Sequence, residues 1–187
     1  MDSRTRGRYY KTMTEKKSEQ FIALLLILAG IGVRLLPHPA NFTPLTAIAL
    51  FSGTVLSPGL ALSVPLIAMM ASDLVLGPHP LCWLVWGSFI LTVGVGFWVK
   101  RNQKIQTIFL GTAAGSILFF ILTNFGVFWF QNMYAKNWTG LADCYLMAVP
   151  FFRNSLLGDL FYSAVFFGIY AMATHSLRHS RESGNQI

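Results

Sequence analysis

The chain has 187 residues, of which 54% are apolar and 11% charged, and its mean hydropathy is +0.54. Because soluble domains usually carry about 25% charged residues, this composition excludes an ordinary soluble fold. The net charge of +7 comes from basic clusters that flank apolar segments, a membrane-topology pattern that argues against a nucleic-acid partner. We therefore predict one all-α domain, a polytopic bundle of about six transmembrane helices embedded in a lipid bilayer.

In chain order, residues 1–19 are polar and basic, and we expect a disordered tail or a short interfacial helix there. The membrane domain then covers 20–175, and 176–187 forms a second tail. The expected spans are 20–36, 44–56, 60–76, 81–99, 105–130 and 154–174.

Two of these segments have unusual lengths. The second apolar segment, 44–56, is short for a membrane crossing, which favours a short helix inside the bundle or a broken one. The connection at 131–153 is too long to be structureless in a compact bundle. We expect its apolar half, 141–152, to fold back as a cap or to lie at the membrane interface.

The basic residues also predict the orientation. They cluster in the first 17 residues, at 100–104 and in the C-terminal tail. With six spans and a cytoplasmic N-terminus, all three clusters lie in the cytoplasm, as the positive-inside rule requires. The prediction is a multi-pass protein of a bacterial inner (cytoplasmic) membrane with both termini cytoplasmic. The loops near 37–43, 77–80 and 131–153 then face outward.

Few charged residues belong to the spans or their outer ends: Arg34, Asp73, Arg153 and Asp159. A charge in hydrocarbon is costly, so such residues usually pair or face a hydrated cavity. Arg34 and Asp73 are expected at similar depth on the first and third spans. They form either a salt bridge that locks the two helices or part of a cavity wall.

A second polar cluster is expected on the last span. Ser155, Asp159 and Tyr162 follow i, i+4 and i+7 and share one helix face, with Asn154 and Gly158 beside them. This face either binds a ligand or makes hydrogen bonds to neighbouring helices.

Aromatic, small and thiol side chains leave further alternatives open. Trp129, Tyr134 and Trp138 form an interfacial belt or stack against a flat ligand. Gly111 and Gly115 on the fifth span allow close helix packing. Cys82 and Cys144 are either two unrelated thiols or the partners of a disulfide at the outer surface.

The sequence has no nucleotide-binding glycine loop, no metal-ligand spacing and no nucleophile with a base in reach. We therefore expect a protein that is not an enzyme and that holds no metal and no cofactor.

Four segments carry a resemblance to a known group of proteins: NFTPLTAIALFSG (41–53), SDLVLGPH (72–79), TNFGV (123–127) and AVPFFRNSLLGD (148–159). They resemble an uncharacterised family of bacterial inner-membrane proteins, over about residues 20–175. That family is similar in size and helix count to the substrate-binding (S) components of energy-coupling-factor (ECF) vitamin transporters. The resemblance implies a six-helix capture protein driven by a transmembrane coupling protein and two ATPase subunits. S components often carry Ala-x-x-x-Ala on the first helix for docking, whereas Ala23 and Ala29 are six apart here.

The leading hypothesis is therefore a membrane-embedded substrate-capture subunit of a vitamin or related micronutrient importer, which binds a small heterocycle from the outer face. The predicted ligand-binding residues combine polar groups with aromatic walls: Asn41, Asp73, Asn124, Trp129, Trp138, Tyr145, Arg153, Asn154, Asp159 and Tyr162. Arg153 is the expected anchor for an anionic group. The alternatives are an ion- or proton-coupled carrier that uses Asp73 and Asp159, and a structural or assembly subunit without a ligand.

Overall fold

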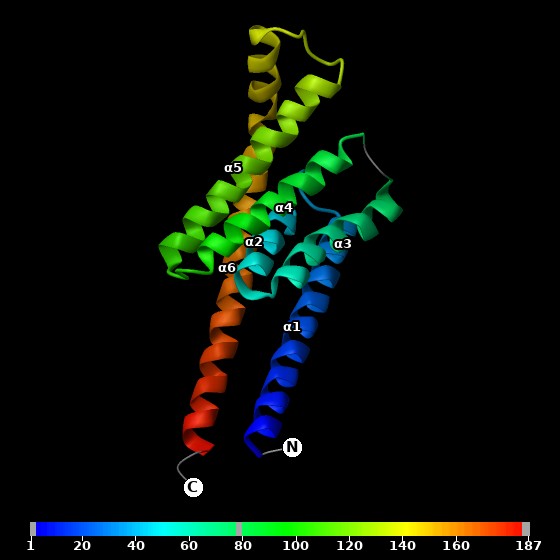
Figure 1. The fold of residues 1–187 in the computed structure, drawn as a ribbon. Helices are drawn as coiled ribbons and strands as arrows, with labels where there is room; N and C mark the ends of the chain where they lie inside the picture. The colour runs from blue at the N-terminus through cyan, green and yellow to red at the C-terminus, as the bar shows by residue number, and fades with distance from the viewer. Residues whose placement is uncertain (1–2, 78–79, 185–187) are drawn as a thin grey trace.

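The computed structural model describes residues 3–77 and 80–184, which form helices and no strand (Figure 1). The six helices of this described part are α1 (Ser3–Leu35), α2 (Leu45–Val55), α3 (Pro58–Leu76), α4 (Cys82–Val99), α5 (Ile105–Phe130) and α6 (Trp138–Gly184). Five helices contain stretches long and apolar enough to cross a membrane: Glu15–Leu35, Pro58–Leu76, Cys82–Val99, Ile105–Phe130 and Trp138–Ser176. The predicted all-α fold is confirmed, and its helices are those of a multi-pass membrane protein.

Helix α2 is the centre of the bundle and contacts every other helix. All its residues from Leu45 to Thr54 are buried. Its 11 residues span about 16 Å at 1.5 Å per residue, roughly half the thickness of the hydrocarbon core. The expected segment at 44–56 is thus a short helix inside the bundle, one of the two forms predicted for it.

Glycines let α2 and α4 approach backbone to backbone. A Cβ built on Gly53 would lie 3.0 Å from the Cα atom of Gly96, and one built on Gly96 would lie 2.8 Å from the Cα atom of Gly53. At this crossing the Thr54 hydroxyl donates to the Gly96 carbonyl at 3.2 Å. The predicted packing role of the glycines on α5 is also seen, because a Cβ on Gly115 would lie 3.0 Å from Thr92 Cγ2 of α4.

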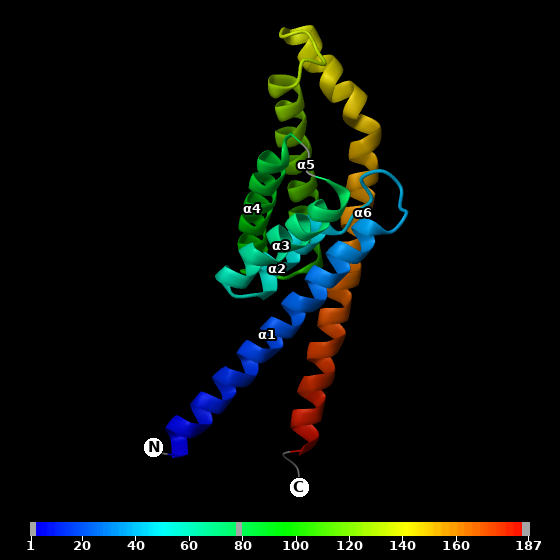
Figure 2. The same cartoon turned by 90° about the vertical axis from the view of Figure 1, so that its right-hand side faces the viewer.

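The N-terminal end of α1 and the C-terminal end of α6 lie at the same end of the molecule (Figures 1 and 2). Helix α5 and the first part of α6 form a hairpin that projects at the opposite end. The short α2 returns the chain between α1 and α3, so both termini lie at the same end of the molecule although five helices are long enough to span. Which side of a membrane this end faces stays a prediction.

The helix bounds correct the expected elements in two places. Helix α1 begins at Ser3, so the basic segment, expected as a disordered tail or a short interfacial helix, is helical and continuous with the first span. Helix α6 begins at Trp138 and runs through Pro150, so the last helix is far longer than the expected 154–174 and leaves a connection of 131–137 only. Pro150 lies inside α6 and does not end it, and prolines inside helices are tolerated in membrane proteins.

Side chains of the short connection explain why α6 starts where it does. Asn137 caps the helix, because its Oδ1 atom accepts the Gly140 N–H at 2.8 Å. Lys136 donates from Nζ to the terminal carbonyls of α5, at Phe128, at Trp129 (3.3 Å) and at Gln131 (2.8 Å). A cation at the negative end of α5 followed directly by a cap for α6 makes a tight turn. The expected turn at 77–80 falls partly outside the described residues, which include Gly77 at φ 90°.

Candidate ligand-binding cavity

Two adjoining cavities lie between α2, α4, α5 and α6, and their volumes are about 220 and 230 Å³. Four residues line both cavities: Asn41, Val85, Phe119 and Ser155. Asn41 belongs to the loop between α1 and α2, is exposed, and has a left-handed backbone (φ 62°) that asparagine adopts more readily than most residues. We refer to the two cavities together as the central cavity, and this loop lies at its mouth.

A salt bridge closes one side of the central cavity. Arg34, at the end of α1, donates from Nη1 to Asp73 Oδ1 at 2.7 Å and to Ser72 Oγ at 2.5 Å. The two side chains are 16% and 8% exposed. The predicted pairing of the first and third spans is confirmed. Arg34 also lines the central cavity, whereas Asp73 does not, so the second alternative applies to Arg34 alone.

Asp159 of α6 lies on the other side and is 2% exposed. Ser116 of α5 donates a hydrogen bond to its Oδ2 atom at 2.7 Å. The Thr46 hydroxyl and the Ala47 amide, in the first turn of α2, face the same carboxyl group. Because α2 has no side-chain cap at Pro44, Asp159 provides an acceptor to the amide end of this helix.

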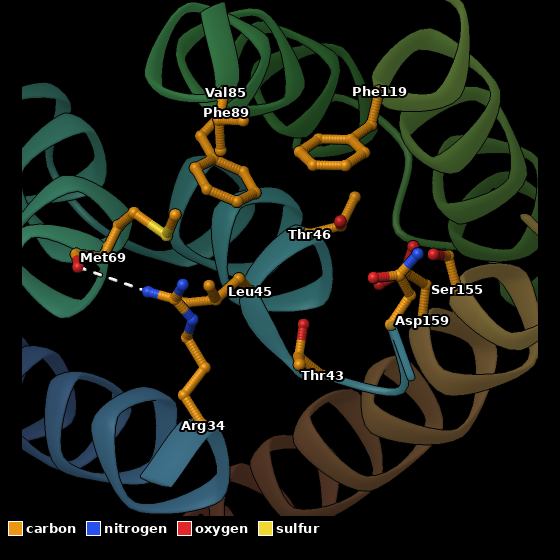
Figure 3. A pocket seen from close by; sticks show the side chains of 11 residues that line it. Arg34, Thr43, Leu45, Thr46, Met69, Val85, Phe89, Phe119, Ser155 and Asp159 are labelled. Atoms are coloured by element: carbon orange, nitrogen blue, oxygen red, sulfur yellow. Dashed lines mark hydrogen bonds between the residues drawn. The ribbon is translucent and has the colours of Figure 1, made fainter. Parts of the chain in front are cut away.

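The wall between these two polar sides is aromatic. The rings of Phe89 from α4 and Phe119 from α5 stack with centroids 5.3 Å apart and an angle of 26° between planes. In Figure 3 these rings lie along one edge of the cavity, while Arg34 and Asp159 enter it from opposite sides. The cavity thus combines a flat apolar surface with a few fixed polar groups, the usual composition of a small-molecule site.

Hydroxyl groups continue from Asp159 between α5 and α6. Ser116 bonds to Asp159, and one turn away the Thr112 hydroxyl donates to Ser163 Oγ at 3.1 Å. Both Thr112 and Ser163 are 2% exposed. Beyond them Phe167, 8% exposed, belongs to the apolar core, so the hydroxyl series ends inside the protein.

The structure brings three of the predicted site residues to the central cavity: Asn41, Asn124 and Asp159. Asp73 does not line the cavity, but its salt bridge holds Arg34, which does. Asn154 holds the mouth loop, because its Nδ2 atom donates to the Ala40 carbonyl at 3.2 Å.

Tyr162, although it shares a helix face with Asp159, packs against the mouth loop, where its ring centroid lies 5.7 Å from that of Phe42. Gly158 leaves the space for this loop, because a Cβ there would lie 3.3 Å from Phe42.

The other four predicted residues do not line the cavity. Trp138 is 86% exposed at the tip of the α5–α6 hairpin, and Trp129 is 60% exposed and stacks on Phe125 at 5.9 Å. The Tyr145 hydroxyl donates to the Ile121 carbonyl of α5 at 2.7 Å. Arg153 is exposed. The early start of α6 explains the positions of the last three, because it places 138–153 on a helix, from which Ala148, Phe151 and Phe152 line the cavity and Trp138, Tyr145 and Arg153 do not.

Sequence reasoning missed several cavity residues. Ser116 of α5 was detectable, because hydroxyl residues lie one turn apart, at 112 and 116, on a largely apolar helix. Thr123 lies beside the predicted Asn124. Phe89 and Phe119 carried no such signal among sixteen phenylalanines. Thr43 and Thr46 lie in a segment for which the sequence did not indicate which side chains face the cavity.

Two further expectations concern a disulfide between the cysteines and a metal site. Cys82 and Cys144 are both free, and the Cys144 thiol donates to the Asn124 carbonyl at 3.4 Å, so the disulfide alternative is wrong for this structure. Within the described residues, histidine, cysteine, aspartate and glutamate form no group that could hold a metal ion.

Fold and cavity together define a class: a helical membrane protein whose centre holds a small, partly polar cavity. The sequence matches the family of unknown function DUF6580 over residues 14–181, and the chain belongs to that family. No curated protein and no solved structure matches it.

Proposed function

We propose that this protein is a substrate-capture subunit of an importer in a bacterial inner membrane, and that it binds a small heterocyclic micronutrient, such as a vitamin, from the outer face. The observation that carries the proposal is the central cavity, where the buried Asp159 and the stacked rings of Phe89 and Phe119 face one volume. Each part is small, but the two adjoin and together fall in the lower part of the range of about 300 to 1,000 Å³ of small-molecule sites.

The charged residues that line the cavity indicate which chemical group of a ligand would fit there. Arg34 and Asp159 are the charged residues that line the cavity, and Asp73 already compensates the charge of Arg34. In the described part of the chain no cation lies in salt-bridge contact with Asp159, whose bonded partner, Ser116, is neutral. A ligand with a cationic or hydrogen-bond-donating edge complements this carboxyl group. Arg153, the anchor expected for an anion, is exposed and does not line the cavity, so we no longer assign it that role.

The proposed partners follow from the resemblance to S components. They are a transmembrane coupling protein and ATPase subunits that release the captured ligand into the cell. The exposed apolar surface of α1, which includes Leu24 and Leu28 (52% and 56% exposed), offers room for a helical partner within the membrane. Co-purification tests this part of the proposal separately from ligand capture.

A second candidate is a proton-coupled carrier, and the hydroxyl series from Asp159 to Ser163 favours it. A carrier needs a polar route to the other side of the membrane, whereas this series ends at the buried Phe167. We therefore place the carrier second. A structural subunit without a ligand is the remaining alternative, in which Asp159 only caps α2.

The test is to purify the protein from its native membrane under mild conditions and to identify bound small molecules by mass spectrometry. We expect a retained heterocycle in the wild-type protein and its loss from Asp159→Asn, which keeps the shape of the side chain. Trp138→Phe is the matched control, because Trp138 lies outside the cavity, and it should retain the ligand. An empty wild-type protein that travels with an unrelated complex would overturn capture in favour of an assembly role.

A further inference from the structure

A second pocket lies between α3 and α4, apart from the central cavity. Its volume is about 500 Å³, and its walls include Ile67, Met70, Asp73, Cys82 and Trp86. None of its lining residues lines the central cavity. We call it the α3–α4 pocket.

Two residues that line this pocket, Asp73 and Trp86, each carry a buried polar atom without a partner. Among the buried side-chain nitrogen and oxygen atoms of the described residues, Asp73 Oδ2 and Trp86 Nε1 have no hydrogen-bond partner. Asp73 Oδ1 pairs with Arg34, so one oxygen holds the helices together and the other is left over. A buried polar atom without a partner is costly and is rare in native proteins, which indicates that something absent from the bare chain binds here.

The surroundings define what this partner is. The other lining residues are apolar apart from Cys82, and three of them lie on the outer face of the bundle: Ile67, Met70 and Leu74 are 47%, 48% and 88% exposed. In a membrane this face meets lipid chains. The occupant therefore has an apolar body.

A single group that both donates and accepts can satisfy one acceptor and one donor. We propose that the α3–α4 pocket binds an apolar molecule through a single hydroxyl group, whose O–H donates to Asp73 Oδ2 and whose oxygen accepts from Trp86 Nε1–H. The bond to the carboxylate is charge-assisted, and both new bonds lie away from water, where they are strong. A lone water satisfies the two atoms but leaves most of an apolar pocket of about 500 Å³ unfilled.

Cys82 provides a reporter that is already in place, because it lines the pocket and is half-buried. The experiment measures the rate at which N-ethylmaleimide alkylates Cys82 in the purified wild-type protein, by mass spectrometry of its peptides. Cys144, 2% exposed, is the internal reference. The two probes, at equal mole fractions in the detergent, are 1-decanol and undecane, which differ only in the hydroxyl group that replaces a terminal methyl.

We expect decanol to slow the alkylation of Cys82 by about fivefold more than undecane does, the effect of one net hydrogen bond. Trp86→Phe, which removes the donor and keeps a ring, should abolish this difference. The control Trp83→Phe removes an indole from the same helix outside the pocket and should preserve it. Equal protection by both probes, or none by either, in the wild-type protein overturns the proposal without needing any variant to fold.

The hydroxyl can come from a membrane lipid or from a free amphiphile. Native mass spectrometry of protein extracted from its own membrane separates the two sources. A retained hydroxyl-bearing lipid, lost in Trp86→Phe, indicates the lipid. Decanol selectivity in a protein that retains no lipid indicates a free hydroxyl compound. Neither result depends on the central cavity, so the proposed capture function can fail while this site stands.

Discussion

The protein buries two carboxyl groups, one on α3 and one on α6, and their surroundings differ. Asp73 on α3 has a guanidinium partner at 2.7 Å and leaves one oxygen toward the α3–α4 pocket. Asp159 on α6 has neutral donors only and faces the central cavity. The paired carboxylate holds two helices together, and we propose that the carboxyl group without a cation is the one that meets a ligand. Asp73 thus stabilises the packing of the helices, whereas Asp159 is part of the cavity lining.

The largest expected effect comes from breaking the compensated pair. Arg34→Leu leaves the Asp73 charge buried without its cation, and such a loss usually costs about 3–5 kcal/mol. We expect a large drop in the melting temperature in mild detergent. The double variant Arg34→Leu with Asp73→Leu removes both charges and should recover most of the stability. A melting temperature for Arg34→Leu equal to that of the wild type would contradict the locking role.

A second prediction concerns the scaffold that positions both carboxyl groups around α2. Gly96→Ala places a Cβ against Gly53 of α2, and overpacking of this kind costs about 1–3 kcal/mol. Gly94→Ala is the matched control, because a Cβ there meets nothing within 4 Å. Thermal unfolding of the two variants should differ clearly. Equal melting temperatures for Gly96→Ala and Gly94→Ala would contradict the close crossing of α2 and α4.

A third prediction sharpens the comparison at Asp159. Ser116→Ala removes a hydrogen bond to this buried carboxyl group, a loss worth about 1.5 kcal/mol. Ser88→Ala makes the same change at another buried serine, whose hydroxyl bonds only to the Leu84 carbonyl of its own helix. Its unfolding free energy should stay closer to that of the wild type. Equal losses in the two variants would mean that Ser116 contributes nothing specific to Asp159.

The smallest expected effect lies far from both carboxyl groups. Asn137→Ala removes the cap of α6, which costs about 1 kcal/mol. Asn137→Asp restores an acceptor and should restore the stability measured by thermal unfolding. Ligand retention should be the same in both variants. Loss of ligand from Asn137→Ala would show that the projecting hairpin takes part in capture.

Much of the fold was predictable from the sequence, because apolar length and flanking charge determine the helices of a membrane protein. The pairing of Arg34 with Asp73 followed from the cost of burying charge, and the close packing at Gly115 from residue size. The start of α6 was missed because polar residues at 131–143 suggested a loop, whereas one asparagine cap and the Lys136 bonds are enough to begin a helix.

The cavity was harder to predict, since its composition depends on how the helices turn toward one another. Asp159 stood out as a charge in a span, but Trp129 and Trp138 were chosen for their type and lie outside the cavity. Phe89 and Phe119 form the aromatic wall instead, and no feature of their local sequence distinguishes them from other buried phenylalanines.

In the proposed function, the carboxyl group of Asp159 attracts a cationic or hydrogen-bond-donating group of the ligand. Ser155 lines both parts of the cavity, so Ser155→Cys, in a protein with Cys82→Ala and Cys144→Ala, reports on it through cationic and anionic methanethiosulfonate reagents. Rates at Trp138→Cys, on the exposed hairpin tip, normalise their intrinsic reactivity. We predict a several-fold preference for the cationic reagent that disappears with Asp159→Asn. A preference for the anionic reagent, or one that Asp159→Asn leaves unchanged, would contradict the account.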